Sequence, residues 1–418
     1  EVANVVLALL PSADQARIHR AIARHLREKA SGDVFRMADH ALRCIEFAEP
    51  ELVSSLLLAA GRKAGVCAPE SARVFLEAAA SSVVREGGQL SYDDAFLLGR
   101  VCTICGALEA GAEAFREALK HAGDRDRVAQ VHLALAGVYA LEFRADTVCA
   151  EIDKGLGALE LPPLRGRLGQ RARALFKRAF RGRHTEPVTG AEVARKKMHL
   201  QFLELGGRMV YLRREFRVAM QLAARANQVA KDLPPCKEQA RSTMAYAIRH
   251  AALGRVADFT SQADRALAIA DRVGGESLAT KLLTARAMGA EILGDFAASE
   301  GDLRLALERG GIRLSAEHFA SSALTLSRSL DRRGYPLEAC AWVQKACSNL
   351  QVATREQLPH FQSSVAYASC LDAACGRHEQ ARDALDLAKN ALKPVATGGA
   401  AKVFLQVCSL RVLYESRV

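Results

Sequence analysis

Apolar residues recur at spacings of three and four along almost the whole chain. This period places them on one face of an α-helix, whereas the alternating Val, Ile, Tyr and Thr runs that favour strands are scarce. Ala, Leu, Arg and Glu dominate, and all four are strong helix formers. The eleven prolines fall between helical stretches or at their first turn, where a backbone N–H has no helical partner. The pattern predicts an all-α protein of many helices, each of about 12 to 20 residues.

A longer period is superimposed on the helical one. Gly254, Gly294 and Gly334 stand 40 residues apart between amphipathic stretches, and the register extends to Arg214 and Gly376. Residues seven before, five after and twelve after each of these marks are small, with Phe259 as the exception. The three columns are Gly207, Ala247, Ala287, Ser327 and Ser369; then Ala219, Phe259, Ser299, Ala339 and Ala381; and then Ala226, Ala266, Ala306, Ala346 and Ala388. Small side chains let two antiparallel helices touch, and a glycine between them caps the first helix. The columns therefore predict stacked helix–turn–helix units.

The same register continues upstream in weaker form. Its turns would lie at Cys67, Gly106 and Arg144, and the last of these has flanking positions Gly137, Cys149 and Leu156. The longer step from 144 to 214 interrupts the array. We expect an N-terminal helical junction at 1–50, divergent units at 51–157, a basic insert at 158–190, and clearer units with a terminal helix at 191–418.

These columns resemble those of the tetratricopeptide repeat (TPR) family. The period departs from the family's, since it is 40 to 42 residues here rather than about 34, and Phe259 replaces a small residue. The resemblance implies an all-α, TPR-like α-α superhelical solenoid.

The N-terminal residues carry a second resemblance. Leu9-Leu10-Pro11, the segment from Arg17 to Ala23 and the segment from Met37 to Leu42 are similar to a junction in large bacterial signalling ATPases of the STAND or AAA type. There the junction follows a winged-helix part and leads into TPR-like repeats. The run Leu156-Gly157-Ala158-Leu159, followed by Leu161-Pro162 and an Arg-rich helix, also resembles a segment between their repeats. The resemblance implies a multidomain bacterial protein of a kind that often also carries a nucleotide cyclase, a protein kinase or a DNA-binding domain. The eleven cysteines, an odd number in a long chain without an export signal, predict reduced, buried thiols and a cytoplasmic location. The chain has no phosphate-binding loop and does not begin with Met, so the nucleotide-binding domain is expected outside it.

Positive charge is concentrated in one segment. The chain has a net charge of +11, and eight basic residues without an acid lie between 161 and 185. They are Arg165, Arg167, Arg171, Arg173, Lys177, Arg178, Arg181 and Arg183. Three interpretations stay open: a solenoid helix with a solvated basic rim, a contact for an acidic partner domain, or a surface for nucleic acid or an anionic membrane. Aromatic residues do not interleave with these charges, which disfavours nucleic acid.

Candidate chemistry is otherwise sparse. Cys102-Thr103-Ile104-Cys105 lacks the second ligand pair of a zinc site, so it is interpreted as core packing, as are the later cysteines. Asp93-Asp94 reads as a helix start near a cap at Ser91, and Ser277 as a residue of a first helical turn. No histidine pair has helical ligand spacing, so we expect no metal, no cofactor and no catalytic site. No run of 18 apolar residues exists, so no membrane span is expected.

The remaining candidate is a binding face. In TPR-like units the first helix of each pair lines the inner surface, and the register assigns eight residues to it. They are Glu204, Arg208, Tyr211, Arg241, Lys281, Glu291, Arg328 and Asp331. Their mixed charges predict a peptide or protein ligand, which includes domains of the same parent chain, although solvated surface groups remain the alternative. The sequence thus predicts a non-catalytic protein-interaction or ligand-sensing region of a bacterial signalling ATPase. The alternatives are a nucleic-acid-binding regulator acting through 161–185, and an enzyme built on an α-solenoid.

Overall fold

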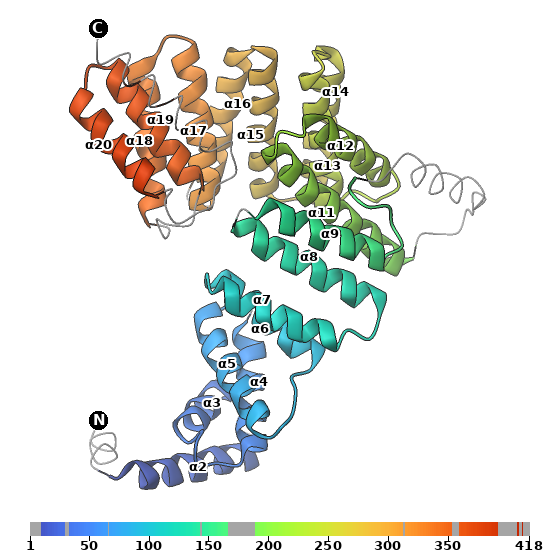
Figure 1. Ribbon diagram of the computed structural model, residues 1–418, viewed down its shortest axis with the longest axis vertical. Coiled ribbons are helices and arrows are strands. Elements are labelled where there is room, and N and C mark those ends of the chain that lie inside the picture. Colours follow the sequence, from blue (N-terminus) through green and yellow to red (C-terminus); the bar gives the residue numbers. More distant parts are fainter. Residues whose placement is uncertain are drawn as a thin grey trace. The chain divides into compact units, whose positions relative to one another are not determined.

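The computed structural model describes residues 10–29, 33–65, 67–142, 144–165, 189–311, 314–352 and 359–391, together with Cys408 and Val412. The described chain is almost entirely α-helical and contains no strand (Figure 1). The predicted all-α class is therefore confirmed. Pro50, Pro69, Pro336 and Pro359 each begin a helix, as the proline pattern predicts. No helix in this part of the chain is long and apolar enough to cross a membrane.

The chain divides into two compact units, Glu1–Val138 and Tyr139–Val418. The boundary falls inside one helix, so the four-part division expected from the sequence stays a prediction. The helices that begin in the first unit are α2 (Ser12–Glu28), α3 (Val34–Arg43), α4 (Pro50–Ala64), α5 (Pro69–Arg85), α6 (Tyr92–Ile104), α7 (Leu108–Lys120) and α8 (Arg125–Leu141). From α2 to α7, each helix packs on the next, most extensively within the hairpins α4–α5 and α6–α7.

The second unit continues the pattern with longer helices. It contains α9 (Ala145–Ala158), α11 (Gly190–Leu212), α12 (Phe216–Ala230), α13 (Lys237–Ala252), α14 (Val256–Val273), α15 (Glu276–Leu293), α16 (Phe296–Gly310), α17 (Ala316–Arg332), α18 (Pro336–Val352), α19 (Pro359–Ala374) and α20 (His378–Ala391). From α11 onward these form five hairpins that stack in sequence order (Figure 1). The first helix of each hairpin also contacts the first helix of the next. Such a stack, in which each unit contacts mainly its neighbours, is the architecture of a helical solenoid.

The turns within these hairpins share one backbone geometry. Gly254, Gly294, Gly334 and Gly376 have φ values between 69° and 84°, in the left-handed region. The N–H of Gly294 bonds to the carbonyl of Glu291 at 3.0 Å, and the N–H of Asp295 bonds to that of Ala290 at 2.9 Å. This pair of bonds caps the last carbonyls of the first helix. The predicted turns at these glycines are confirmed.

The predicted turn at Arg144 is one residue too late. The N–H of Arg144 bonds to the carbonyl of Tyr139, five residues earlier, at 3.1 Å. Its φ and ψ of −81° and 66° match those of Asp295, the residue that follows a turn glycine. The positions seven before, five after and twelve after the turn shift accordingly to the buried Ala136, Val148 and Gly155. The prediction failed because no glycine marks this turn.

In the four hairpins whose turns are glycines, the column seven residues before the turn lies where helices meet. Ala247, Ala287, Ser327 and Ser369 are fully buried. The exception, Phe259 on α14, packs against Gly289 on α15, where an added Cβ would lie 2.4 Å from the ring. Because Gly289 has no side chain, the neighbouring hairpin leaves room for the Phe259 ring.

Candidate ligand-binding face of the second unit

The eight residues predicted to line the inner surface all lie on first helices of the second unit. Counted from the turn of each hairpin, they stand 3, 6, 10 or 13 residues before it. These steps of three and four keep side chains on one helix face. We call this surface the first-helix face, and it comprises Glu204, Arg208, Tyr211, Arg241, Lys281, Glu291, Arg328 and Asp331.

Polar contacts join α11 to α13 across this face. The Arg241 guanidinium lies 3.8 Å from the Glu204 carboxylate, and both side chains are more than a third exposed. Beside them, the Gln201 amide donates to Glu238 at 3.3 Å. An ion pair of this separation and exposure contributes little stability, so both charges can exchange partners readily.

The contacts between α15 and α17 are more strongly buried. Glu291, whose side chain is 17% exposed, accepts from the Arg328 guanidinium at 3.4 Å and from the Ser329 hydroxyl at 2.9 Å. On the same pair of helices the Thr284 and Ser322 hydroxyls are hydrogen-bonded at 2.8 Å. These bonds connect residues 37 or 38 apart in the sequence, close to the repeat period.

A further bond joins α17 to α19, where the Tyr367 hydroxyl donates to Asp331 at 2.8 Å. Together with Glu204–Arg241 and Glu291–Arg328, it forms a series that we call the first-helix ladder. The ladder positions five of the eight predicted residues by contacts between neighbouring hairpins.

The other three predicted residues differ among themselves. Arg208 is exposed, and Tyr211 is 55% exposed with its ring edge-to-face on Phe216 at 5.3 Å. Lys281 is half-buried and is engaged with a neighbouring group. Met288, 40% exposed and six residues before its turn, occupies the register position of Arg208 and Arg328. The sequence prediction missed it because only polar residues were selected, although its spacing would have found it.

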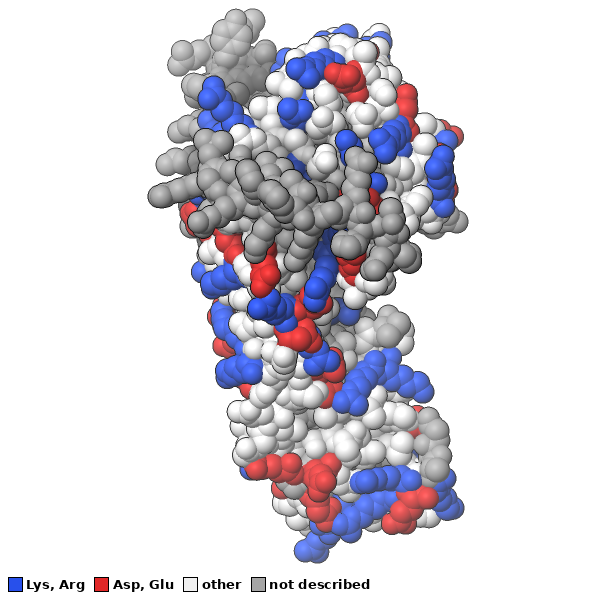
Figure 2. Space-filling view, turned by 90° about the vertical axis from the view of Figure 1, so that its right-hand side faces the viewer, with Lys and Arg blue, Asp and Glu red and all other residues white. Residues whose placement is uncertain are grey.

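Opposite charges are mixed on one side of the molecule. On the side shown in Figure 2, lysine and arginine side chains alternate with aspartate and glutamate over the described residues, without one continuous field of either sign. A surface of this kind complements a ligand that carries both charges better than it complements a polyanion.

Solved structures provide the comparison for this fold. No protein-family model and no curated protein sequence matches the chain. The apo form of the quorum sensor NprR from B. thuringiensis matches with a TM-score of 0.53 and 10% identity, over 84% of this chain and 91% of NprR. Apo RapI matches with a TM-score of 0.50 and 13% identity, over 74% of this chain and all of RapI. Both are TPR-like helical-repeat proteins. The chain has a TPR-like solenoid fold.

A third similar structure is a STAND signal-transduction ATPase with a TPR sensor from Pyrococcus horikoshii. It has a TM-score of 0.46 and 12% identity, and the match covers 94% of this chain but 55% of that protein.

The basic segment lies almost entirely outside the described residues. Of its eight basic side chains only Arg165 is described, and it pairs with Glu215 at 2.6 Å. The residues just before it are fixed to the TPR-like stack. Arg225 of α12 donates to the carbonyls of Pro162 at 2.7 Å and Pro163 at 3.2 Å. The start of the basic segment is therefore held by α12. Arg167 to Arg183 lie outside the described residues, so the three interpretations of their charge remain predictions.

Seven of the cysteines are buried, among them Cys102, Cys340 and Cys370, whereas Cys67 is exposed. Burial, with a contribution from Glu77, raises the pKa of Cys102 to about 11, and burial raises that of Cys347 to about 12. Such thiols are protonated at neutral pH and are poor nucleophiles. Nowhere among the described residues do three His, Cys, Asp or Glu side chains group as metal ligands would. Ser277 lies in the first turn of α15, and Ser91 caps α6, as predicted.

Proposed function

We propose that the chain is a non-catalytic region that binds a peptide or protein on the first-helix face of its second unit. The first-helix ladder is the observation that supports this proposal. From α15 to α19 it holds the half-buried carboxylates of Glu291 and Asp331 by hydrogen bonds from the next hairpin, so a ligand lying across these helices meets groups that are already ordered. Preorganised groups lose less conformational entropy on binding, which favours affinity.

The exposed residues of the face suit an amphipathic ligand. Arg208 and Tyr211 of α11 offer a charged donor and apolar contact area, and Met288 offers further apolar area at the equivalent position of α15. Aromatic residues and arginine are the side chains that most often dominate binding energy at protein interfaces. A peptide that presents an acidic and an apolar side chain would match both.

Binding would act by changing the stack. A solenoid unit contacts mainly its neighbours, so a ligand that bridges several first helices can alter their spacing and the pose of whatever is attached. NprR is a quorum sensor with the same type of fold, and the proposal gives this chain a sensing task of the same general kind.

We also propose that the chain is the sensor or interaction region of a bacterial signalling ATPase. The resemblance of residues 9–42 to the junction in such proteins supports this assignment. It requires that the complete gene encode a nucleotide-binding domain before Glu1, which sequencing of the parent reading frame would test. An open reading frame without such a domain would remove the ATPase assignment but would leave the binding face untouched.

The binding proposal is tested with peptides selected from a random dodecapeptide library on the immobilised chain. We expect Arg208→Ala combined with Arg328→Ala to weaken the affinity of the selected peptides about tenfold or more, as fluorescence anisotropy would show. The matched control is Arg265→Ala with Arg382→Ala, which removes two exposed arginines from the second helices α14 and α20. Failure to select any peptide, or an equal loss in both double variants, would contradict the assignment.

A further inference from the structure

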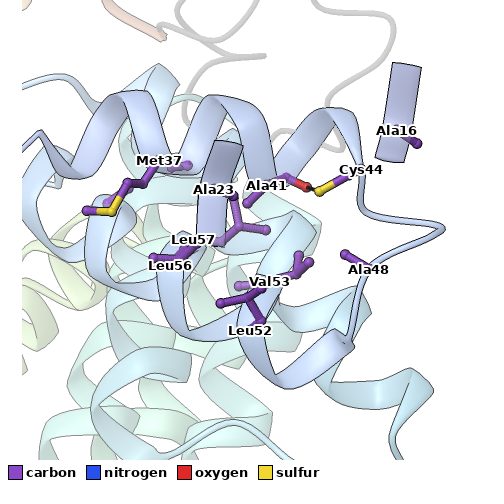
Figure 3. Close-up of a cluster of buried hydrophobic side chains, with 13 residues drawn as sticks. Ala16, Ala23, Met37, Ala41, Cys44, Ala48, Leu52, Val53, Leu56 and Leu57 are labelled. Carbon is purple, nitrogen blue, oxygen red and sulfur yellow. Dashed lines mark hydrogen bonds between the residues drawn. The ribbon is translucent and has the colours of Figure 1, made fainter. Parts of the chain in front are cut away.

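Helix α2 is held in the first unit by a narrow buried stripe. Its buried residues are Ala16, His19 and Ala23, and the two alanines join a cluster with residues of α3 and α4 (Figure 3). Alanines bury little apolar area, and Leu26 is the one larger apolar side chain of this 17-residue helix that packs, partly buried, against the cluster. The one large polar side chain in the stripe therefore has a strong influence on whether the helix stays docked.

That side chain pairs with a histidine of α3. The Nδ1 atoms of His19 and His40 lie 2.8 Å apart, and the rings are tilted by 33° with centroids 5.1 Å apart. His19 is 6% exposed and His40 is half-buried. One imidazole must donate its Nδ1–H while the other accepts at an unprotonated Nδ1. The bond survives one added proton but not two, because two imidazolium rings have no acceptor nitrogen.

We propose that the His19–His40 pair makes the docking of α2 on α3 sensitive to pH, with the helix released once both imidazoles carry a proton. Two positive charges at hydrogen-bonding distance in a largely buried site repel each other and lose their solvation. Undocking relieves both effects.

The charged groups around the pair add to this bias. Burial is the largest cause that lowers the pKa of His19 below its ordinary 6.5, followed by His40 and Arg43. Burial also lowers the pKa of His40, where Arg36 and Arg43 act in the same direction and Asp39 opposes them. A histidine whose pKa is lowered in the docked state stabilises docking above pH 6.5. That stability is lost as the pH falls below 6.5, because the undocked state then binds more protons.

Two other contacts hold α2 without a histidine. Arg24 pairs with Glu49, and the Arg20 guanidinium donates to the carbonyl of Phe47 at 3.3 Å. A change in the protection of α2 between pH 7.5 and pH 5 would therefore report on the histidine pair.

Hydrogen exchange on the full chain tests the proposal. An undocked helix of this length is marginal in water, so its amides lose protection. We expect the protection factor of residues 12–28, corrected for the intrinsic exchange rate, to fall about tenfold or more from pH 7.5 to pH 5. Residues 92–104 of α6 should keep their protection and serve as the internal reference.

Two substitutions test whether the histidine pair, and not another group, causes the loss of protection at low pH. In His40→Asn the amide can replace Nδ1 as a partner of His19 without titrating, so α2 should stay protected at both pH values. The control His25→Asn removes an exposed histidine from the same helix and should retain the wild-type fall. A wild-type helix that is equally protected at both pH values overturns the proposal, as does an unchanged fall in a docked His40→Asn variant. If His40→Asn is already unprotected at pH 7.5, His19→Asn is measured in the same way. A wild-type fall with both variants unprotected supports the pair as the contact that holds α2.

Discussion

At the scale of single residues, close approach between helices depends on glycines that face aromatic rings. An added Cβ on Gly289 would lie 2.4 Å from the Phe259 ring, and one on Gly99 would lie 2.7 Å from the Phe115 ring. Both rings are almost completely buried. Because interiors are close-packed, neither ring can move aside without disturbing its own neighbours.

The first prediction concerns this contact. Gly289→Ala should destabilise the protein by about 1 to 3 kcal/mol through overpacking. Phe259→Ala should cost about 3 to 5 kcal/mol through the cavity it leaves. In the double variant the new methyl group occupies part of that cavity, so the loss should be smaller than the sum by about 1 kcal/mol or more. Urea unfolding followed by circular dichroism measures all three.

Gly301 provides the matched control, because it lies inside α16 with no atom within 4 Å of an added Cβ. There the substitution to alanine should stabilise the helix by about 0.5 to 1 kcal/mol. Strict additivity at positions 259 and 289, or a loss at Gly301→Ala, would contradict the packing argument.

At the scale of elements, the hairpins depend on left-handed turn residues. Four of the five turns inside the hairpins from α11–α12 to α19–α20 use glycine, but Arg214 adopts the same conformation at φ 62°. A side chain there is strained, since its Cβ crowds the backbone. The turn still forms because the capping bonds of the α11–α12 hairpin hold it: the Arg214 N–H bonds to Tyr211 and the Glu215 N–H to Val210.

The second prediction is that Arg214→Gly stabilises the protein by about 1 kcal/mol, because it removes this strain. The reverse change at an equivalent turn, Gly294→Ala, should destabilise by about the same amount. Thermal unfolding of the two variants beside the wild type provides the measurement. Equal melting temperatures for all three proteins would show that the turn conformation does not limit stability.

At the scale of the whole molecule, the stacked arrangement should allow some hairpins to unfold while others stay folded. Contacts within the second unit join mainly adjacent hairpins, so distant hairpins support each other only through those between them. Trp342 is the single tryptophan of the chain and packs beside the core cluster formed by α15 to α19. Its fluorescence therefore reports on that part alone, whereas circular dichroism reports on all helices.

The third prediction is that these two signals give different midpoints in urea, because a repeat array need not unfold in one step. Gly334→Ala, in the turn between α17 and α18, should shift the fluorescence midpoint more than the dichroism midpoint. Coincident transitions in the wild type and equal shifts in the variant would instead indicate one cooperative unit.

The sequence by itself determined the helices, the hairpin turns marked by glycine and the small-residue columns. These features are local and repeated, so periodicity is enough to reveal them. It also assigned the first-helix face, since residues spaced by three and four on one helix share a side wherever that helix packs.

Only the tertiary structure decided which side chains meet. The bonds of Glu291 to Arg328, of Asp331 to Tyr367 and of His19 to His40 join residues 21 to 37 apart. Whether such pairs touch depends on the rotation of each helix and the offset between hairpins, and neither leaves a periodic signal. The turn before Arg144 was misplaced for a related reason: without a glycine, two adjacent registers have similar local patterns, and only packing distinguishes them.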